Sequence, residues 1–328
     1  MNMPTDPASD DTLGAVGEVA ALARIFPRLP ESSAQLLGPG DDAAVIAAPD
    51  GRYVVTTDMM IHGPDFRLAW SSPHDLGWKA AASNLADIAA MGAVPTALVA
   101  AIAAPADSPV SLLEGVADGF RDACAALAPG CGIVGGDLSV SDTLTIAVTA
   151  FGDLEGREPV LRSGARVGDV VAVSGPLGHA AAALRVLFTD AVDSLGVPDA
   201  ELAAGLRGST AAQLAPSPPI ADGKLAALAG ATAMLDLSDG LAIDAARVAR
   251  ASGVAIDFEH EALGPDPELA LGGGEDHSLF ATFPPGSGLP GGFRRVGAVV
   301  AGGGILLDGE PHEVSGWDPF RGWDHAAG

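Results

Sequence analysis

The acidic turn GPGDD at residues 38–42, followed closely by TTD at residues 56–58, is the feature that most constrains how the chain can fold. Two short β-rich runs lie between these motifs, on either side of the turn signal Pro49-Asp50-Gly51. The pattern predicts a β-hairpin, with Asp42 at the start of one strand and Asp58 at the end of its partner. The two carboxylates should then lie close together.

Carboxylates crowded at strand ends repel one another unless a cation lies between them. Hard oxygen ligands of this kind suit Mg²⁺, which proteins usually share with the phosphates of a nucleotide. The alternative for this hairpin alone is that its acids are turn residues and helix caps. The rest of the chain has to distinguish the two interpretations.

The charge of the chain limits its partners. Its 328 residues include 42 Asp plus Glu against 17 Lys plus Arg, a formal charge of −25, and Lys79 and Lys224 are the only lysines. Such a surface repels nucleic acid and anionic membranes, so neither is expected as a partner. No stretch has the pattern of a signal peptide or a membrane helix, and Cys124 and Cys131 suit buried or incidental thiols in a reducing compartment. We expect a cytoplasmic protein.

A long helix with a polar stripe follows the predicted hairpin. Residues 72–75 supply a serine N-cap, a proline at the first helical position and an acid three residues after the cap, and Gly92 marks the end. Along this helix Lys79, Ser83 and Asp87 recur every four residues among alanine, leucine and isoleucine. Such a stripe is either a solvated face or the lining of a site. The small alanines beside it favour a tightly packed helix whose polar residues line something.

Glycine-rich turns with acids recur at predicted strand ends. A short strand at residues 132–134 is expected to stop at GGD, residues 135–137. Glycines before an acid let the backbone approach a ligand while the carboxylate reaches a metal, although tight turns look the same. LDLSDG at 235–240 and GGGED at 272–276 repeat the pattern, with helix capping as the alternative role for the first. A glycine turn at residues 175–178 could form an anion-binding helix start.

The mixture of strands and helices in both halves is typical of α+β domains. A chain of this length suits two domains of ordinary size. We expect a disordered leader at residues 1–14, an N-terminal domain at residues 15–153 and a C-terminal domain at residues 154–328.

Seven motifs, in order along the chain, resemble the thiamine-monophosphate kinase family. They are GPGDDAAVI (38–46), TTDMMIHGPDF (56–66), KAAASNLADIAAMGA (79–93), GGD (135–137), RSGA (162–165), LDLSDG (235–240) and GGGED (272–276). No single motif is decisive, but the ordered series is specific and covers nearly the whole chain. The family belongs to a superfamily of ATP-using enzymes with an aminoimidazole ribonucleotide synthetase-like fold. The resemblance implies two α+β domains and a homodimer whose N-terminal strands join across the two-fold axis.

The resemblance also implies a site. The ligands of several Mg²⁺ ions would be Asp42, Thr56, Thr57, Asp58, Asp87, Asp137, Asp236 and Asp239. ATP would be held by Arg162 and Ser238, with Gly135 and Gly136 beside it. The thiamine moiety would contact Glu275 and an aromatic residue near the C-terminus, for which Trp323 is the candidate.

The reaction implied is transfer of the γ-phosphoryl group of ATP to thiamine monophosphate, which gives thiamine diphosphate. The nucleophile is a phosphate oxygen that is already anionic, so no general base is required. The chemistry would instead be carried by a metal cluster at Asp42, Asp87 and Asp137. The main alternative is another ATP-dependent enzyme of the same superfamily acting on a different acceptor. A calcium- or nucleotide-binding module is a weaker alternative, because no EF-hand loop or nonapeptide repeat occurs.

One position departs from the family pattern. Where the family has a substrate-contacting histidine just before a phenylalanine, this chain has Asp65 before Phe66, and His62 lies on the other side of Gly63. The role is therefore lost, taken by Asp65, or supplied by His62. A carboxylate would be favourable beside the positively charged thiazolium or the pyrimidine amino group. Our hypothesis is that Asp65 faces the organic part of the substrate, and the alternative is a solvent-exposed loop acid.

Overall fold

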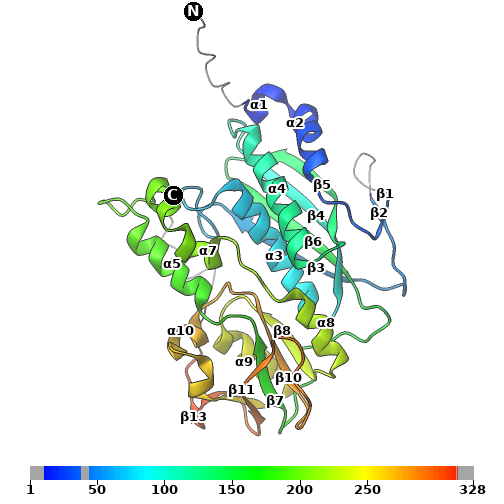
Figure 1. Ribbon diagram of the computed structural model, residues 1–328, viewed down its shortest axis with the longest axis vertical. Coiled ribbons are helices and arrows are strands. Elements are labelled where there is room, and N and C mark those ends of the chain that lie inside the picture. Colours follow the sequence, from blue (N-terminus) through cyan, green and yellow to red (C-terminus); the bar gives the residue numbers. More distant parts are fainter. Residues whose placement is uncertain (1–10, 38–43, 315, 317–328) are drawn as a thin grey trace, which may run out of the picture.

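The computed structural model describes residues 11–37, 44–314 and 316, and it contains two large sheets with one helix, α3, in contact with both (Figure 1). The N-terminal part forms a four-stranded sheet and the C-terminal part a seven-stranded sheet. No helix within these described ranges is long and apolar enough to cross a membrane. The mixture of helices and sheets agrees with the predicted α+β class.

One face of the four-stranded sheet is covered by helices and the other is open. The strands run in the order β3-β6-β4-β5, with bounds Val54–Ile61 for β3, Val94–Ala104 for β4, Gly132–Val140 for β5 and Thr145–Asp153 for β6. Helices α3 (Pro73–Ala90) and α4 (Val110–Leu127) lie side by side on one face. Because side chains alternate along a strand, Ile146 and Val148 are buried beneath these helices, whereas Ala147 points to the other side. We call the two sides the covered face and the open face.

The predicted hairpin between residues 43–48 and 52–57 is wrong. Strand β2 (Val45–Ile46) pairs with β1 (Gln35–Leu37) in a separate two-stranded sheet, whereas β3 pairs antiparallel with β6 over its whole length. Turn residues set only the local geometry. Strand β3 has one face to bury, and pairing with β6 in a sheet covered by helices buries more of that face than pairing with the two-residue strand β2 would.

Helix α3 has the predicted bounds. Ser72 accepts a hydrogen bond from the backbone N–H of Asp75 while the Asp75 carboxylate accepts one from the backbone N–H of Ser72, which forms a capping box. After the helix, Gly92 has a φ of 74°, a left-handed conformation that ends the helical path without a Cβ penalty. The sequence therefore predicts this element correctly from its two ends.

Backbones approach α3 closely from two sides. A Cβ atom on Gly119 of α4 would lie 2.1 Å from the carbonyl oxygen of His74, and one on Gly223 of α8 (Ile220–Leu228) would lie 2.1 Å from that of Ala89. Only glycine fits at these two crossings. The small residues of α3 and its neighbours thus allow one helix to be enclosed on nearly every side, which is why it is rich in alanine.

The seven-stranded sheet has the order β13-β12-β9-β11-β7-β10-β8. Its strands are β7 (Val170–Ser174), β8 (Ala233–Leu237), β9 (Ala255–Phe258), β10 (Ser278–Phe283), β11 (Arg294–Val300), β12 (Gly304–Leu307) and β13 (Glu310–Pro311). The helices of this part are α5 (His179–Asp190), α6 (Ala200–Gly205), α7 (Arg207–Leu214), α8, α9 (Leu241–Ser252) and α10 (Pro267–Gly272). Edge strand β8 contacts α3, so the two sheets meet at this helix.

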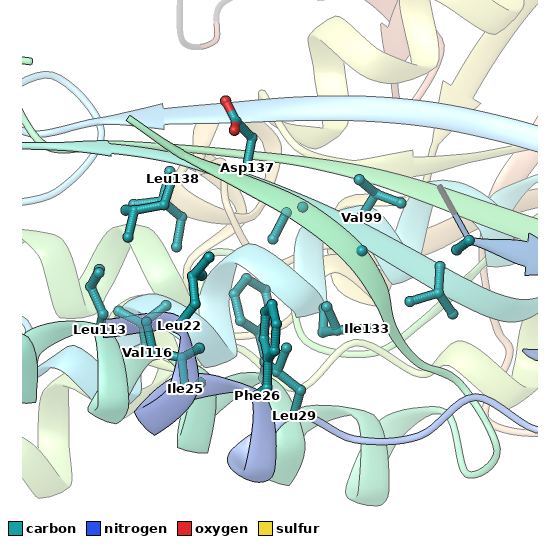
Figure 2. Close-up of a pocket in the computed structure, with 18 of the residues that line it drawn as sticks. Leu22, Ile25, Phe26, Leu29, Val99, Leu113, Val116, Ile133, Asp137 and Leu138 are labelled. Atoms are coloured by element: carbon teal, nitrogen blue, oxygen red, sulfur yellow. The ribbon is translucent and has the colours of Figure 1, made fainter. Parts of the chain in front are cut away.

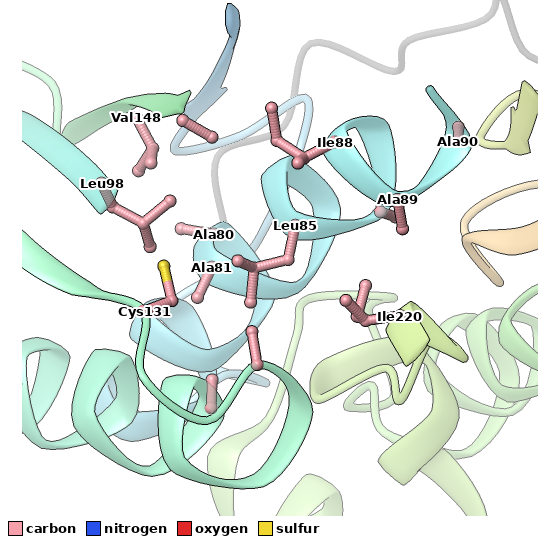
Figure 3. Packing of buried hydrophobic residues seen from close by; sticks show 14 of the residues in the cluster. Ala80, Ala81, Leu85, Ile88, Ala89, Ala90, Leu98, Cys131, Val148 and Ile220 are labelled. Carbon is pink, nitrogen blue, oxygen red and sulfur yellow. The ribbon is translucent and has the colours of Figure 1, made fainter. Parts of the chain in front are cut away.

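One apolar core joins the two parts. Leu85 and Ala89 of α3 belong to the same buried cluster as Ile220 of α8, and Figure 3 shows these side chains together. Phe283 of β10 belongs to that cluster too. The predicted domain boundary after residue 153 stays a prediction, because this core extends across it.

The N-terminal segment packs beside α4. Helices α1 (Leu13–Val16) and α2 (Glu18–Ile25) form there, and the backbone N–H groups of Leu13 and Gly14 donate to the carbonyl oxygens of Ser108 and Ala106. Residues 11–14, which the sequence assigns to a disordered leader, therefore have a defined structure. Residues 1–10 lie outside the described part of the chain.

Candidate functional site

The polar stripe of α3 is not a solvated face. Lys79 and Ser83 are only 6% and 8% exposed, and Asp87 is half-buried. Each lies against the C-terminal part of the chain or beneath the four-stranded sheet. The solvated-face alternative is therefore wrong, because buried polar side chains on an otherwise apolar helix need partners. That the stripe lines a site stays a prediction.

Three carboxylates interact near the C-terminal end of α3, and we call Asp58, Asp87 and Asp236 the carboxylate cluster. Asp58 lies on β3 and Asp236 on β8, so the cluster spans both sheets. Burial, and then the charges of Asp236 and Asp58, raise the pKa of Asp87 to about 7. Burial also raises the pKa of Asp58, with Asp236 adding to the shift. Mutual repulsion of this kind is relieved when a cation enters.

The donor set of the cluster fits a hard divalent cation. Thr56 Oγ1 donates to Asp87 Oδ2 at 2.8 Å, which orients this carboxylate. Among residues 11–37, 44–314 and 316, no three His, Cys, Asp or Glu side chains converge closely enough to hold a metal ion unaided. Mg²⁺ typically takes only one or two carboxylates, and phosphate oxygens and water complete its shell. The cluster therefore suits a metal that arrives with a phosphorylated ligand.

His277 supports the cluster from the C-terminal part. Its Nδ1 lies 3.4 Å from Asp236 Oδ2, and its side chain is 8% exposed. Burial alone would lower the pKa of His277, but the hydrogen bond to Asp236 and the nearby negative charge raise it overall. The sequence analysis missed this residue, although it directly follows the GGGED motif.

The LSDG turn is fixed by a network that the sequence analysis also missed. Asp244 is fully buried and accepts hydrogen bonds from the backbone N–H groups of Asp239 and Gly240 at 3.0 and 3.1 Å. Arg247 forms ion pairs with Asp244 and with Asp239, the latter at 2.5 Å. Burial, as the largest cause, raises the pKa of Asp244 to about 7. Neither Ser238 nor Asp239 caps α9, so the capping alternative is wrong.

The GGGED turn contacts two other segments, the LSDG turn and the start of α5. Glu275 adopts a φ of 67°, in the left-handed region, and its backbone N–H donates to the carbonyl oxygen of Ser238. Asp276 accepts hydrogen bonds from the backbone N–H groups of Gly178 and Ala180 at the start of α5. The predicted anion-binding helix start after residues 175–178 does bind an anion, but that anion is the protein's own Asp276 carboxylate.

A cavity of about 480 Å³ opens beside this turn, between α3, α5 and α7. Its aromatic end is formed by Phe66, Trp70 and Phe188, and the guanidinium of Arg67 lies 4.7 Å from the ring centroids of both Trp70 and Phe188. We call it the aromatic cavity. Its size and its mixture of apolar and polar walls suit a small heterocyclic ligand.

The polar end of the aromatic cavity is formed by three side chains. Lys79 Nζ lies 2.6 Å from Glu275 Oε2, and Gln213 Nε2 donates to the same oxygen. Burial alone would raise the pKa of Glu275, but the charge and hydrogen bond of Lys79, the charge of His277 and the hydrogen bond from Gln213 together lower this pKa below its usual value. Gln213 Oε1 is buried and has no hydrogen-bond partner among the residues that the structure describes. An unsatisfied buried acceptor at a cavity wall is typical of a ligand-binding position.

Asp65 lines this cavity, whereas His62 does not belong to its lining. Asp65 Oδ2 accepts a hydrogen bond from the backbone N–H of Ile61 at 2.7 Å, and burial raises the pKa of Asp65. The ring of His62 instead packs against Phe66, with 5.6 Å between the centroids. Asp65 is therefore placed as the hypothesis requires, and its contact with a substrate stays a prediction.

The predicted ligands of β3 and β5 are divided between the two faces of the sheet. Thr56 and Asp58 lie on the covered face, while Thr57 lies on the open face, where its Oγ1 donates to the carbonyl oxygen of Val148. Asp137 is also on the open face, and Figure 2 shows it directed away from Leu113 and Val116 of α4. Within one chain, the structure does not bring Asp137 together with Asp87, as the predicted cluster requires.

The strand predicted to stop before GGD does not stop there. β5 continues to Val140 and contains a bulge, because Ile133 pairs with Leu98 and Gly135 with Val99, which leaves Val134 as an extra residue. A Cβ on Gly136 would lie 2.1 Å from the carbonyl oxygen of Ala100. Strand geometry therefore explains Gly136, whereas a Cβ on Gly135 would have no atom within 4 Å. ATP contacts at Gly135 and Gly136 stay a prediction.

Other predicted residues lie apart or outside the described part. Arg162 is exposed, and the neighbouring carbonyl oxygen of Leu161 accepts from the backbone N–H of Met234, near the start of β8. Ser238 follows the opposite end of that strand, so the two predicted ATP contacts do not meet in one chain. Asp42 and Trp323 lie outside the described residues.

A second cavity, of about 520 Å³, lies between α2, α4 and β5 (Figure 2). Its lining is apolar apart from Glu18 and Asp137, and the Asp137 side chain points away from the apolar residues. Few polar groups converge here, so the chemistry of the molecule is better assigned to the aromatic cavity and the carboxylate cluster.

The chain is similar to known proteins in sequence and in fold. Residues 40–154 match the family AIR synthase related protein, N-terminal domain. The thiamine-monophosphate kinase of Mycobacterium tuberculosis is 42% identical, over 95% of this chain and 92% of that protein. Two solved structures are also similar. The thiamine-monophosphate kinase of Stenotrophomonas maltophilia K279a has a TM-score of 0.74 at 32% identity, over 89% of this chain and 95% of the other. AaThiL complexed with AMPPCP and TMP has a TM-score of 0.71 at 31% identity, over 92% and 96%.

These similarities extend over both sheets and the helix between them, at identities that indicate common descent rather than a shared fold alone. The chain belongs to the thiamine-monophosphate kinase family.

Proposed function

We propose that the protein transfers the γ-phosphoryl group of ATP to thiamine monophosphate and forms thiamine diphosphate. The observation that carries the proposal is that one helix connects two sites. Lys79 lines the aromatic cavity and Asp87 belongs to the carboxylate cluster. Position 87 is eight positions after position 79, a rise of roughly 12 Å along a helix. A phosphorylated heterocycle in the cavity can thus present its phosphate toward a nucleotide at the carboxylates. The similar AaThiL was solved complexed with AMPPCP and TMP.

The aromatic cavity suits the organic part of this substrate. The thiazolium ring of thiamine is cationic and flat, and it would be stabilised by the rings of Phe66, Trp70 and Phe188. The carboxylates of Glu275 and Asp65 supply negative charge on the same wall. The C-terminal aromatic contact at Trp323 is part of this proposal on the strength of the family pattern alone.

The carboxylate cluster suits Mg²⁺ ions that enter with ATP. Asp58, Asp87 and Asp236 would hold them, with Thr56, Thr57, Asp42, Asp137 and Asp239 as the further ligands that the family pattern implies. Bound Mg²⁺ would offset the negative charge that builds up on the transferring phosphoryl group. The protein's own contribution is orientation: Thr56 holds Asp87, His277 holds Asp236 and Arg247 holds Asp239. No side chain has to remove a proton from the nucleophile.

We further propose that two copies pair through their open faces. Val55 and Met59 are 59% and 58% exposed there, a substantial apolar surface for one sheet. Pairing would cover it and would bring Thr57 and Asp137 of each copy under a partner. The strong negative charge makes nucleic acid and anionic membranes poor partners. ATP binding by Arg162 and Ser238 and the cytoplasmic location stay predictions.

The direct test is product formation with purified protein, ATP and Mg²⁺. We expect ADP and thiamine diphosphate in equal amounts from thiamine monophosphate, and no reaction when the metal is chelated. Free thiamine should be a poor acceptor because it lacks the nucleophilic phosphate. Equal turnover of free thiamine would refute the assignment. ADP release that does not depend on thiamine monophosphate would instead favour a different acceptor of the same superfamily.

A further inference from the structure

The ion pair at the polar end of the aromatic cavity contains one residue, Lys79, to which no partner in the substrate has been assigned so far. Lys79 is 7% exposed at its side chain and is bonded to Glu275, which comes from the other part of the chain. Taking the Lys79 charge out of water costs free energy, as does the partial burial of Glu275, whose side chain is 34% exposed, and an ion pair of this kind contributes little net stability. A pair kept at such a cost at a cavity wall is a candidate for exchange with a charged ligand.

Lys79 lies between the two halves of the site. Its charge acts on Asp65 at the cavity and on His277 at the carboxylate cluster. Arg67, the other cation among the described residues that line the cavity, lies between two rings at the aromatic end. Of the two cations that line the cavity among the described residues, Lys79 is therefore the one whose charge also acts at the carboxylate cluster.

Thiamine monophosphate carries both signs of charge, with a cationic ring system at one end and an anionic phosphate at the other. The Lys79–Glu275 pair carries the complementary signs at one cavity wall. If both partners exchange together, neither buried charge is left unpaired. The unsatisfied Oε1 of Gln213 can accept a hydrogen bond from the amino group of the ligand's pyrimidine ring, which supplies a neutral contact beside Glu275.

We propose that Lys79 binds the phosphate of the acceptor after leaving Glu275, while Glu275 and Gln213 turn to the cationic and amino-bearing rings. Lys79 would thus hold the nucleophile and also select for it. Free thiamine takes Glu275 but leaves Lys79 buried without a counterion, so it binds poorly. This inference rests on the proposed function and adds the residue that distinguishes the phosphorylated acceptor from the unphosphorylated one.

The test is calorimetric binding of thiamine monophosphate and of thiamine, separately, without ATP. We expect the wild-type protein to prefer the phosphorylated ligand by about 100-fold, the order of strength of a buried charge-assisted contact. In Lys79→Met, thiamine monophosphate should bind about 30-fold more weakly or worse, whereas thiamine should bind unchanged or more tightly, because Glu275 is no longer paired. Lys224→Met is the matched control, since that lysine pairs with Glu155 on the surface, and both affinities should stay as in the wild type.

Two further variants separate selection from folding. Glu275→Gln should weaken the binding of both ligands and should keep the preference for the phosphorylated one. Lys79→Met combined with Glu275→Gln leaves no unpaired buried charge, so it should fold, and it should have no preference. The inference is overturned if Lys79→Met weakens both ligands alike, if the double variant keeps the preference, or if the wild type shows none. Thiamine diphosphate formation by the wild type is measured separately, so a failure of the proposed function is recognised on its own.

Discussion

The two faces of the four-stranded sheet carry the same kinds of residue in opposite surroundings. On the covered side, partial burial and the charge of Asp236 raise the pKa of Asp87 of α3, which is half-buried, and of Asp58 of β3, although the Asp58 side chain is exposed. On the open face, Thr57 and Asp137 lie beside exposed apolar side chains. One chain therefore brings together the predicted ligands on the covered side and leaves those on the open face, Thr57 and Asp137, exposed. Under the proposed pairing of two copies, the open face would acquire its function only when the partner lies on it.

The covered face should be the more sensitive to a change of charge. Asp87→Asn keeps the shape of the side chain and removes a hard anionic ligand, so kcat should fall on the order of 10³-fold while the protein stays folded. ADP release at saturating substrates and a thermal melt measure the two effects. Asp107→Asn, an exposed acid in the loop before α4, is the control. An Asp87→Asn protein with near-normal activity and unchanged Mg²⁺ dependence would remove the cluster from catalysis.

The open face should matter to a neighbouring copy. Asp137→Asn alone should lower kcat by about 100-fold if the residue binds metal across a dimer interface. Mixing it with Asp87→Asn under conditions that exchange subunits should restore about a quarter of the wild-type rate, because half of the dimers are mixed and each has one intact site. If the mixture stays inactive, the two residues serve the same site from the same chain, or the open face has no catalytic part.

Pairing through the open face can be tested without chemistry. Met59→Asp puts a carboxylate on the exposed apolar surface, and burying it against a partner would cost hydration, so the dimer should dissociate at least about tenfold more readily. Light scattering after size exclusion, over a range of concentrations, should show the shift toward the 32.5 kDa chain. Leu195→Asp adds the same charge to an exposed leucine in a distant loop and should leave the mass unchanged. Equal behaviour of the two variants would exclude the open face as the interface.

The smallest expected effect is on stability against pH. The pKa of Asp87 is raised from 3.8 to about 7 in the fold, so the folded protein without metal holds a proton that the unfolded chain has already lost. Stability from this group therefore decreases as pH rises between about 4 and 7. Melting temperatures without Mg²⁺ should fall across this window, and less steeply for Asp87→Asn than for Asp107→Asn. Identical slopes for the two variants would show that Asp87 titrates normally.

Local signals in the sequence predict local structure well here. The N-cap at Ser72 and the glycine at residue 92 predict the start and the end of α3. These features depend on capping and on turn residues, both of which act within a few positions. The resemblance to the family supplied the list of candidate site residues, which local signals alone do not give.

What the sequence could not predict depends on partners far away in the chain. β3 pairs with β6, about 90 positions later, rather than with its neighbour β2, and no turn signal records that choice. The face on which Asp137 lies follows from strand register, which a motif does not state. Asp244 and Arg247 were missed because the helix-capping alternative explained the turn without them.

The shared core around α3 affects how the protein is made. Its N-terminal sheet is complete at residue 153, but the side of α3 that meets β8 and β10 is covered only when residue 283 has been synthesised. Some 190 residues separate the end of α3 from residue 283. The ribosome needs about 10 to 40 seconds to synthesise a segment of this length. During that interval the nascent chain carries an uncovered alanine-rich apolar surface. The first half of this protein should therefore depend on chaperones or on ribosome proximity until the second half emerges.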